Sequence, residues 1–280
     1  MKPEKGDSEA GVVGVFSRAA PTYDRIGPQV FAHFGERLVE RTRPAPDAAV
    51  LDVATGRGAV LLPAAGQVGP GGRVIGIDMS ATMVREIETD IRSTGTESRH
   101  IEIRQMDAEH LDFADASFDQ VLCGFALWFF PHPEDALREF FRVLRPSGYV
   151  GLTTWTDDCP FLAWYDRELA AAISQGAPPA SGRSGAGRFD TPARLEAALQ
   201  LTGFVGVDII SETADFIYAD EEEWWSSLWS AGTRRRLEAL TTPELNRVKA
   251  EMLDKVRALK EADGIHTLWR ALLASAQKPA

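Results

Sequence analysis

Two carboxylates and two glycines in the first third of the sequence have the types and spacing of a nucleotide site. Asp52 ends an apolar run, and Gly56 and Gly58 follow it in a short turn before an Ala/Leu-rich helical pattern. Asp78 lies twenty residues after Gly58, behind the next apolar run. Such a turn between a strand and a helix N-terminus cradles nucleotides, and the later carboxylate is placed to accept hydrogen bonds from ribose hydroxyls. The sequence therefore predicts a nucleotide-containing ligand.

The glycine spacing argues against a nicotinamide or flavin dinucleotide as that ligand. The dinucleotide fingerprint G-x-G-x-x-G needs a third glycine, which allows the helix to pack closely on the strand. When Gly56 is taken as the first glycine, the third position is Leu61. When Ala54 is taken as the first position, the first glycine is missing and the third position is Ala59. An oxidoreductase is therefore disfavoured.

The segments around these residues alternate between short apolar runs and amphipathic helical patterns. We predict strands at residues 49–53, 73–77, 101–105, 118–125 and 149–155, and helices at 57–67, 81–94 and 133–144. Ser80 is a suitable N-cap for the second helix. Beyond these we predict a helix at 157–175, a flexible loop at 176–188, a helix from 192 that stops at 203, a strand at 206–218, helices within 221–262 and a strand at 265–273. This alternation predicts an α/β fold with a doubly wound, mostly parallel sheet.

Composition limits the class of protein. The 280 residues suit one large domain: we expect disorder at 1–12, an N-terminal helical lid at 13–45, a cofactor-binding core at 46–155, and lid insertions with the remaining elements at 156–280. The net charge of −11, without a strong basic patch, argues against nucleic acid as a partner. Two cysteines are too few for a metal cluster. Without an apolar signal region or a run of membrane-spanning length, we expect a cytoplasmic protein that does not insert into membranes.

Five ordered motifs resemble those of the class I S-adenosylmethionine-dependent methyltransferases. They are Leu51 to Gly58, Gly76 to Ser80, Met106 to Glu109, Phe118 to Leu122, and Glu139 to Gly148. The Ala54-Thr55-Gly56 step is similar to the branch of ubiquinone/menaquinone-biosynthesis C-methyltransferases. This resemblance implies S-adenosyl-L-methionine as the cofactor. It also implies a Rossmann-like methyltransferase fold of seven strands, the last antiparallel, with a helical lid.

The resemblance assigns a role to each part of the expected cofactor site. Asp52 orients the loop and the amino end of the cofactor, Asp78 accepts both ribose hydroxyls, and Asp107 accepts the adenine amino group. A helix N-terminal acid is the alternative for Asp78, and a turn or cap residue is the alternative for Asp107. The expected cofactor-binding residues are Tyr23, Asp52, Ala54, Thr55, Gly56, Gly58, Asp78, Met79, Met106, Asp107, Ala108, Gly124 and Phe125.

The segment after the fourth predicted strand indicates the kind of methyl acceptor. Residues 124–127 stand where enzymes that methylate amino groups of adenine or glutamine have an Asn/Asp-Pro-Pro-Tyr motif, and residues 127–133 form an aromatic edge. The chain also lacks the Pro-Cys of cytosine C5 enzymes and an acidic set like that of the metal-dependent catechol O-methyltransferases. We therefore expect a small, fairly apolar or aromatic metabolite of specialised biosynthesis, methylated on carbon, nitrogen or oxygen without a metal. Candidate catalytic residues are His132 and Tyr23, and candidate substrate-binding residues are Phe16, Trp128 and Trp155.

Each candidate in the acceptor site also has a structural interpretation. His132 is flanked by prolines, as surface histidines often are, and His266 is interpreted as an ordinary partly buried histidine. Packing within a helix or the core is the alternative for Tyr23, Phe16, Trp128 and Trp155. Two other functions stay open for the whole chain: a cofactor-binding protein that catalyses a different reaction, such as a cyclisation, and a non-catalytic binding module. The oligomeric state is open between a monomer and a homodimer.

Overall fold

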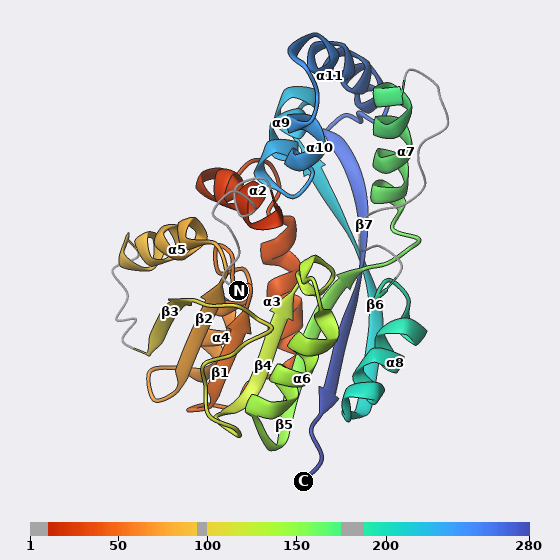
Figure 1. The fold of residues 1–280 in the computed structure, drawn as a ribbon. Helices are drawn as coiled ribbons and strands as arrows, with labels where there is room; N and C mark the ends of the chain where they lie inside the picture. The colour runs from red at the N-terminus through yellow and green to blue at the C-terminus, as the bar shows by residue number, and fades with distance from the viewer. Residues whose placement is uncertain (1–10, 94–99, 175–187) are drawn as a thin grey trace. The chain divides into compact units, whose positions relative to one another are not determined.

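Seven strands form one sheet in the order β3-β2-β1-β4-β5-β7-β6 (Figure 1). The computed structural model describes residues 11–93, 100–174 and 188–280. The strands are β1 (Ala49–Val53), β2 (Arg73–Asp78), β3 (Ile101–Gln105), β4 (Phe118–Gly124), β5 (Leu144–Trp155), β6 (Val205–Tyr218) and β7 (Ile265–Gln277). β1 pairs in parallel with β2 and β4, whereas β7 runs antiparallel to β5. The predicted seven-stranded, mostly parallel sheet with an antiparallel last strand is confirmed.

The strand order reverses between β1 and β4, and this reversal indicates where the sheet binds a ligand. From β1 the chain continues to β2 and β3 on one side, and it later returns to β4 and β5 on the other side. Ligands of doubly wound sheets bind at the carboxyl ends of the strands, where the order reverses. Asp52 and the glycine turn lie at the carboxyl end of β1, and Gly124 ends β4.

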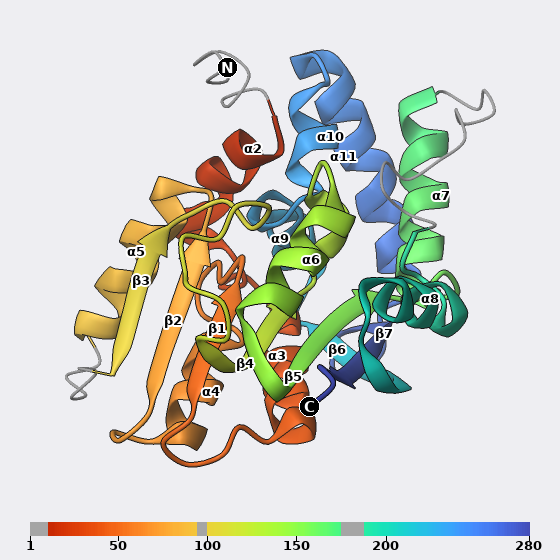
Figure 2. The ribbon, with the colours of Figure 1, turned by 60° about the horizontal axis from the view of Figure 1, so that its bottom comes forward.

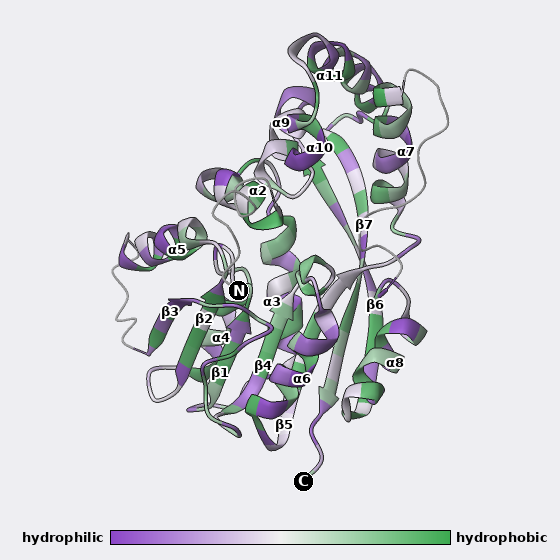
Figure 3. Cartoon of the chain, in the orientation of Figure 1, coloured by the Kyte–Doolittle hydropathy of each residue, from purple (hydrophilic) through white to green (hydrophobic). Residues whose placement is uncertain are grey.

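Helices cover both faces of the sheet and bury alternate residues of its strands (Figures 1 and 2). One face carries α3 (Val30–Thr42), α4 (Leu61–Val68) and α5 (Ala81–Ser93), and the other carries α6 (Pro133–Val143) and α8 (Pro192–Thr202). On β1, Val50 packs in the core beneath α3, α4 and α5, whereas Leu51 and Val53 pack in the core beneath α6 and α8. Hydrophilic and hydrophobic residues alternate along α6 (Figure 3), as expected for a helix with one face on a core.

The chain forms two compact units, each with its own core. The sheet unit comprises the described residues within 31–156, 185–212 and 271–280, and the helical unit comprises those within 11–30, 157–184 and 213–270. The helical unit contains α2 (Val12–Ala19), η1 (Ala20–Thr22), α7 (Pro160–Ser174), α9 (Glu221–Ser227), η3 (Leu228–Ser230), α10 (Arg234–Glu238) and α11 (Thr242–Arg257). Its core contains the buried side chains of Tyr165, Trp224 and Met252, which come from three different helices.

The glycine turn is longer than the sequence predicts. A helix is predicted from residue 57, but α4 begins at Leu61, so that prediction is wrong for residues 57–60. Gly58 has a φ of +84°, which a right-handed helix does not allow, and residues 57–60 form turns instead. β5 also begins earlier than predicted, at Leu144, because its first residue pairs with Phe118 before a register shift.

Two predictions on local order fall partly outside the described residues. The expected disorder of residues 1–12 concerns mainly 1–10, and the expected loop concerns mainly 176–187; neither of these two stretches belongs to the described part of the chain. Within the described residues, α2 begins at Val12. None of the helices described by the structure combines the length and apolarity needed to cross a membrane.

Gly35 on α3 allows that helix to pack against the backbone in front of α4. A Cβ atom at this position would collide with the carbonyl oxygen of Ala59. We expect Gly35→Ala to lower the free energy of unfolding by about 2 kcal/mol, because backbone atoms cannot move aside as a flexible side chain would. Gly66 on α4 is the matched control, since a Cβ there would have no atom within 4 Å. Gly66→Ala should raise stability by roughly 0.5–1 kcal/mol through helix propensity.

Urea denaturation of the wild type and both variants measures the two effects. A Gly35→Ala variant as stable as Gly66→Ala would contradict the close packing of α3 on this backbone.

Candidate functional site

The turn between β1 and α4 has three residues in the left-handed region of backbone conformation. Ala54, Gly56 and Gly58 have φ values of +56°, +52° and +84°. A glycine adopts such angles without strain, whereas Ala54 pays about 1 kcal/mol for its Cβ. The Thr55 N–H donates to the carbonyl oxygen of Ile77 at 2.9 Å, which ties the turn to the end of β2. The turn therefore presents its backbone at the carboxyl ends of β1 and β2.

Asp52 is a buried carboxylate beneath this turn. Asp52 is 1% exposed, and the Thr55 hydroxyl donates a hydrogen bond of 2.6 Å to the Oδ2 atom of Asp52. Burial raises the pKa of Asp52 to about 7; hydrogen bonds from Thr55 and the Leu61 backbone act against this rise, and the nearby charge of Asp78 adds to it. Through Thr55 and Leu61, Asp52 joins the two ends of the turn, as expected for a residue that orients the loop.

Asp78 ends β2 and faces the same turn. Its Oδ2 atom accepts a hydrogen bond from the Gly56 N–H at 3.0 Å, and its Oδ1 atom accepts one from the Ser80 N–H at 2.8 Å. Burial raises the pKa of Asp78, and these two backbone donors act against that rise. Ser80 Oγ accepts from the Met83 N–H at 3.2 Å, so Ser80 caps α5 as predicted. The two carboxyl groups give the site acceptor oxygens suited to hydroxyl and ammonium donors.

The start of the loop after β3 lies beside Asp78. The Met106 N–H donates to the Asp78 carbonyl oxygen at 3.1 Å, and the Gln105 side-chain amide donates to the Met79 carbonyl oxygen at 3.1 Å. Met79 itself is 46% exposed, an unusual position for a large apolar side chain. The structure thus brings together Asp78, Met79 and Met106, three of the expected cofactor residues.

Asp107 has the hydrogen bonds of a turn residue. Its Oδ1 atom accepts from the Glu109 N–H at 2.9 Å, and His110 Nδ1 lies 3.4 Å from its Oδ2 atom. This geometry matches the turn alternative for Asp107. The next residue, Ala108, is buried in the core of the sheet unit. Recognition of the adenine amino group by Asp107 stays a prediction.

Aromatic side chains gather where β4 and β5 end. The Phe125 ring stacks on the Trp155 ring with 4.0 Å between centroids. The centroids of the Phe31, Phe34 and Trp128 rings lie 5.6–6.2 Å from that of Phe125, in edge-to-face arrangements. We call these five residues the aromatic cluster. Trp128 lies on the short helix η2 (Leu127–Phe129), and Phe31 and Phe34 lie on α3. Phe34 was not predicted from the sequence, although its position three residues after Phe31 on one helix was a usable signal.

Phe125 has a strained backbone in this cluster. Its φ is +53°, and its N–H donates at 3.1 Å to both the carbonyl and the hydroxyl oxygen of Thr153. A bulky residue in this region costs on the order of 1–3 kcal/mol, and such strain is typical of functional sites. The preceding residue, Gly124, ends β4 beside Val60 of the glycine turn, since a Cβ on Gly124 would lie 2.9 Å from the Val60 side chain.

Phe16 and Tyr23 belong to the helical unit and contact each other there. Their ring centroids lie 5.9 Å apart in an edge-to-face arrangement. The same segment is attached to α10, because Arg18 Nε donates to Glu238 Oε1 at 2.8 Å. The Arg18 and Arg234 guanidinium groups lower the pKa of Glu238 to about 2. Contacts of Phe16 and Tyr23 with a cofactor or acceptor stay predictions.

His132 lies at the N-terminus of α6 and is exposed. Its backbone N–H donates to Glu109 Oε1 at 2.6 Å, and Pro133 is the first residue of the helix. The exposure matches the surface alternative. A role of His132 as a base stays a prediction.

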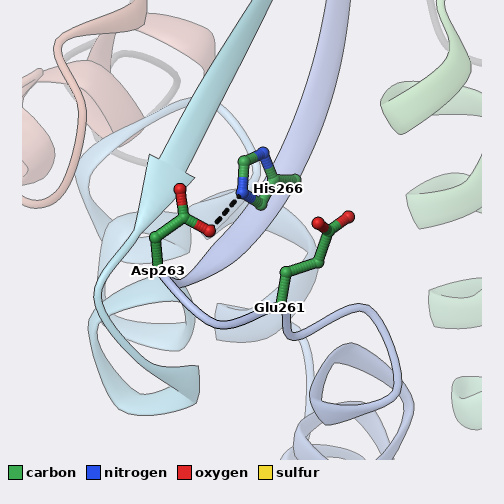
Figure 4. A group of neighbouring side chains, drawn as sticks. All are labelled: Glu261, Asp263 and His266. Atoms are coloured by element: carbon green, nitrogen blue, oxygen red, sulfur yellow. Dashed lines mark hydrogen bonds and ion pairs between the residues drawn. The ribbon is translucent and has the colours of Figure 1, made fainter.

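His266 is held between carboxylates of the helical unit. Figure 4 shows Asp263 and Glu261 beside its ring, and Asp263 Oδ1 lies 2.9 Å from Nε2. Asp215 Oδ2 lies 2.5 Å from Nδ1 on the other side. These hydrogen bonds raise the pKa of His266 to about 9, so both ring nitrogens carry a proton near neutral pH. In that state the ring donates to both carboxylates, and the three side chains of Asp215, Asp263 and His266 form an ion-pair network.

Arg57 is a residue of the glycine turn that the sequence analysis did not single out. Its side chain is 6% exposed and forms ion pairs with Glu86 and Asp90 of α5. The available signal was a basic residue between two glycines of a nucleotide loop, together with two acidic residues four positions apart in the helix predicted at 81–94.

Comparison with known proteins assigns the chain to a family. Residues 51–152 match the family described as Methyltransferase domain. The nocamycin O-methyltransferase of Saccharothrix syringae is 31% identical over 254 residues, which are 87% of this chain and 90% of that protein. The chain belongs to the S-adenosylmethionine-dependent methyltransferases. The predicted enzyme class and the predicted cofactor, S-adenosyl-L-methionine, are thereby confirmed.

Two further proteins are similar to this methyltransferase, one in sequence and one in fold. The demethylmenaquinone methyltransferase of Lactobacillus johnsonii is 33% identical over 148 residues, which are 51% of this chain and 60% of that protein. This relative confirms the resemblance to the menaquinone-biosynthesis branch. A crystal structure of the (4+2)-cyclase SpnF has a TM-score of 0.59 at 20% identity and covers 98% of this chain and 96% of that chain. At this identity the cyclase shows the fold alone.

The pKa of Asp52 leads to a prediction on the pH dependence of stability. Between about pH 4 and pH 7 the folded protein holds a proton on Asp52 that the unfolded chain releases. The stability contributed by this group is therefore fully present below about pH 4 and is lost as the pH rises through 7. In Asp52→Asn this titration is absent, and the amide oxygen can still accept from Thr55.

Urea unfolding of wild type and Asp52→Asn between pH 4.5 and 8 tests this prediction. We expect the free energy of unfolding of the wild type to fall relative to that of the variant as the pH rises. A constant difference over the whole range would show that Asp52 is ionised in the folded protein.

Proposed function

We propose that this methyltransferase transfers the methyl group of S-adenosylmethionine to a small, fairly apolar or aromatic metabolite of specialised metabolism. The aromatic cluster supports this choice, because it lines the ends of β4 and β5 next to the glycine turn. Stacked and edge-on rings favour a flat apolar partner. The names of the two relatives describe O-methylation of nocamycin and methylation of demethylmenaquinone, which are small molecules.

The donor is held by the ends of the first three strands in this proposal. Asp78 accepts the ribose hydroxyls, the exposed Met79 covers one face of the adenine, and Asp107 accepts the adenine amino group. Asp52 orients the turn and the amino end of the donor. The fit rests on the buried Asp52, on the partly buried Asp78 and on a turn whose left-handed backbone lets the amino-acid part approach closely. The other proposed contacts are Tyr23, Ala54, Thr55, Gly56, Gly58, Met106, Ala108, Gly124 and Phe125.

The bound cofactor supplies an activated methyl group on a sulfonium centre. A carbon, nitrogen or oxygen atom of the acceptor forms the new bond to the methyl carbon as the sulfur–carbon bond breaks, and the sulfonium becomes a neutral thioether. The protein's part is to align the acceptor and exclude water, which the aromatic cluster suits. Where the acceptor must lose a proton, His132 and Tyr23 are the candidate bases. Phe16, Trp128 and Trp155 are the candidate acceptor contacts.

A non-methylating reaction such as a cyclisation is the second candidate, because a cyclase shares this fold over nearly its whole length. Product mass separates the two: methylation adds one methyl group and releases S-adenosylhomocysteine, whereas cyclisation does neither. The net charge of −11 supports a small acceptor in preference to nucleic acid. A homodimer is compatible with the proposal, and light scattering of the purified protein decides it.

Asp78→Ala tests the donor site. The variant loses the proposed acceptor of both ribose hydroxyls, and a hydrogen bond to a charged group contributes about 1.5–3 kcal/mol. We expect the affinity for S-adenosylmethionine to fall by about 10- to 100-fold in isothermal titration calorimetry. Glu102→Gln is the control, because Glu102 lies on neighbouring β3 and pairs with Arg104 at the surface. Unchanged affinity in Asp78→Ala would make the ribose assignment wrong.

Trp155→Ala tests the acceptor site. With a panel of phenolic and quinol acceptors, we expect wild type to add one methyl group, detected by mass spectrometry. Loss of the Trp155 ring should lower the turnover of any accepted compound by about tenfold or more while donor affinity is preserved. Tyr149→Ala is the control, because Tyr149 lies toward the other end of β5 and is 43% exposed. Equal turnover in the two variants would exclude Trp155 from acceptor binding.

A further inference from the structure

Arg57 connects the glycine turn to the helix that follows the ribose carboxylate. Its Nε and Nη2 atoms donate to Asp90 Oδ2 at 2.8 and 2.5 Å, and its Nη1 atom donates to Glu86 Oε2 at 2.9 Å. The Arg57 side chain is 6% exposed, and those of Glu86 and Asp90 are 33% and 19% exposed. One guanidinium therefore bridges two carboxylates in a largely buried arrangement.

The position of this bridge relates it to the donor site. Arg57 lies between Gly56 and Gly58, and α5 begins three residues after Asp78. Gly58 packs against the same helix, because a Cβ on Gly58 would lie 2.7 Å from the Ile87 side chain. The turn is thus fixed to the β2–α5 segment by the Arg57 ion pairs, by the contact of Gly58 with α5, and by the hydrogen bonds from the Thr55 and Gly56 N–H groups to Ile77 and Asp78.

Such a fixed position matters because a glycine turn has little conformational preference of its own. Ordering the backbone of one residue costs about 1–2 kcal/mol, and glycine loses more freedom than other residues. If the folded protein has already ordered the turn, this cost does not reduce ligand affinity. The planar guanidinium suits the task, because its donors can serve two carboxylates in a defined geometry. Glu86 and Asp90 carry like charges four residues apart on one helix, and the Arg57 guanidinium pairs with both of them.

We propose that Arg57 is a positioning residue that holds the glycine turn ready for the amino-acid part of the cofactor through its ion pairs with Glu86 and Asp90. The inference rests on the proposed donor site, in which the turn receives this part and Asp78 receives the ribose. Loss of Arg57 then weakens ligands that carry the amino-acid tail and leaves ligands without it almost unaffected.

Two ligands separate this role from a general effect on folding. S-adenosylhomocysteine carries the amino-acid tail, whereas 5′-methylthioadenosine shares its nucleoside and sulfur but lacks the tail. By calorimetry we expect Arg57→Ala to bind S-adenosylhomocysteine about tenfold more weakly than wild type, which corresponds to ~1.4 kcal/mol. Its affinity for 5′-methylthioadenosine should stay within about twofold. The affinity of Arg57→Lys for S-adenosylhomocysteine should lie between those of wild type and Arg57→Ala, because an ammonium group keeps the charge but loses the planar fork.

Arg73→Ala is the matched control. Arg73 forms an ion pair with Glu102 in the same unit, but at the start of β2 and with half of its side chain exposed. This variant should bind both ligands as wild type does. Asp90→Asn is the second variant, because it removes one ion pair and keeps the polar side chain. It should show a smaller loss of the same kind, and it replaces Arg57→Ala if that variant does not fold in a thermal melt.

The outcomes distinguish failure of the proposed donor site from failure of the positioning role of Arg57. Failure of wild type to bind S-adenosylhomocysteine would overturn the donor site itself. If wild type binds it, an equal loss for both ligands in the folded variants means that Arg57 only stabilises the fold. Unchanged affinity for both ligands means that the turn is ordered without Arg57. Either of the last two results overturns the positioning role and leaves the donor site standing.

Discussion

The burial of Asp52 beneath a left-handed turn is the constraint on which the arrangement at the carboxyl ends of β1 and β2 depends. A carboxylate that is removed from water needs hydrogen-bond donors, and here the Thr55 hydroxyl and the Leu61 backbone supply them. Both donors are within reach only because the chain reverses through Ala54, Gly56 and Gly58 with positive φ values. The same reversal brings the Gly56 N–H to Asp78, so one local conformation organises both carboxylates.

The sheet topology converts these local features into a site. Parallel pairing of β1 with β2 and with β4 brings three strand ends to one edge, and each end carries a different kind of group. The end of β1 carries the turn, the end of β2 carries Asp78, and the end of β4 carries the strained Phe125. In the proposed function, polar groups for the donor and aromatic groups for the acceptor thus come from neighbouring strands of one sheet, which suits a reaction that depends on alignment.

The sequence predicted the parts of the site that depend on short-range order. Asp52, Gly56 and Asp78 occur in a pattern whose strand, turn and helix follow from local periodicity, and Ser80 caps α5 as its type suggests. The predicted start of the first core helix at residue 57 was wrong because Gly58 has the left-handed conformation, which apolar periodicity does not show. Phe34 and Arg57 were missed because the contact partners of each lie tens of residues away: directly after β4 and at the end of β5 for Phe34, and on α5 for Arg57.

By its own pattern the sequence determined the α/β class, the glycine turn and the methyltransferase family, because these depend on residues close together along the chain. Only the tertiary structure decided which side chains meet across strands. It stacked Phe125 on Trp155, joined Arg57 to Glu86 and Asp90, and placed His266 between two carboxylates. The physical reason is that such contacts, and the burial that raises the pKa of Asp52 to about 7, depend on strand register and helix packing over long distances in sequence.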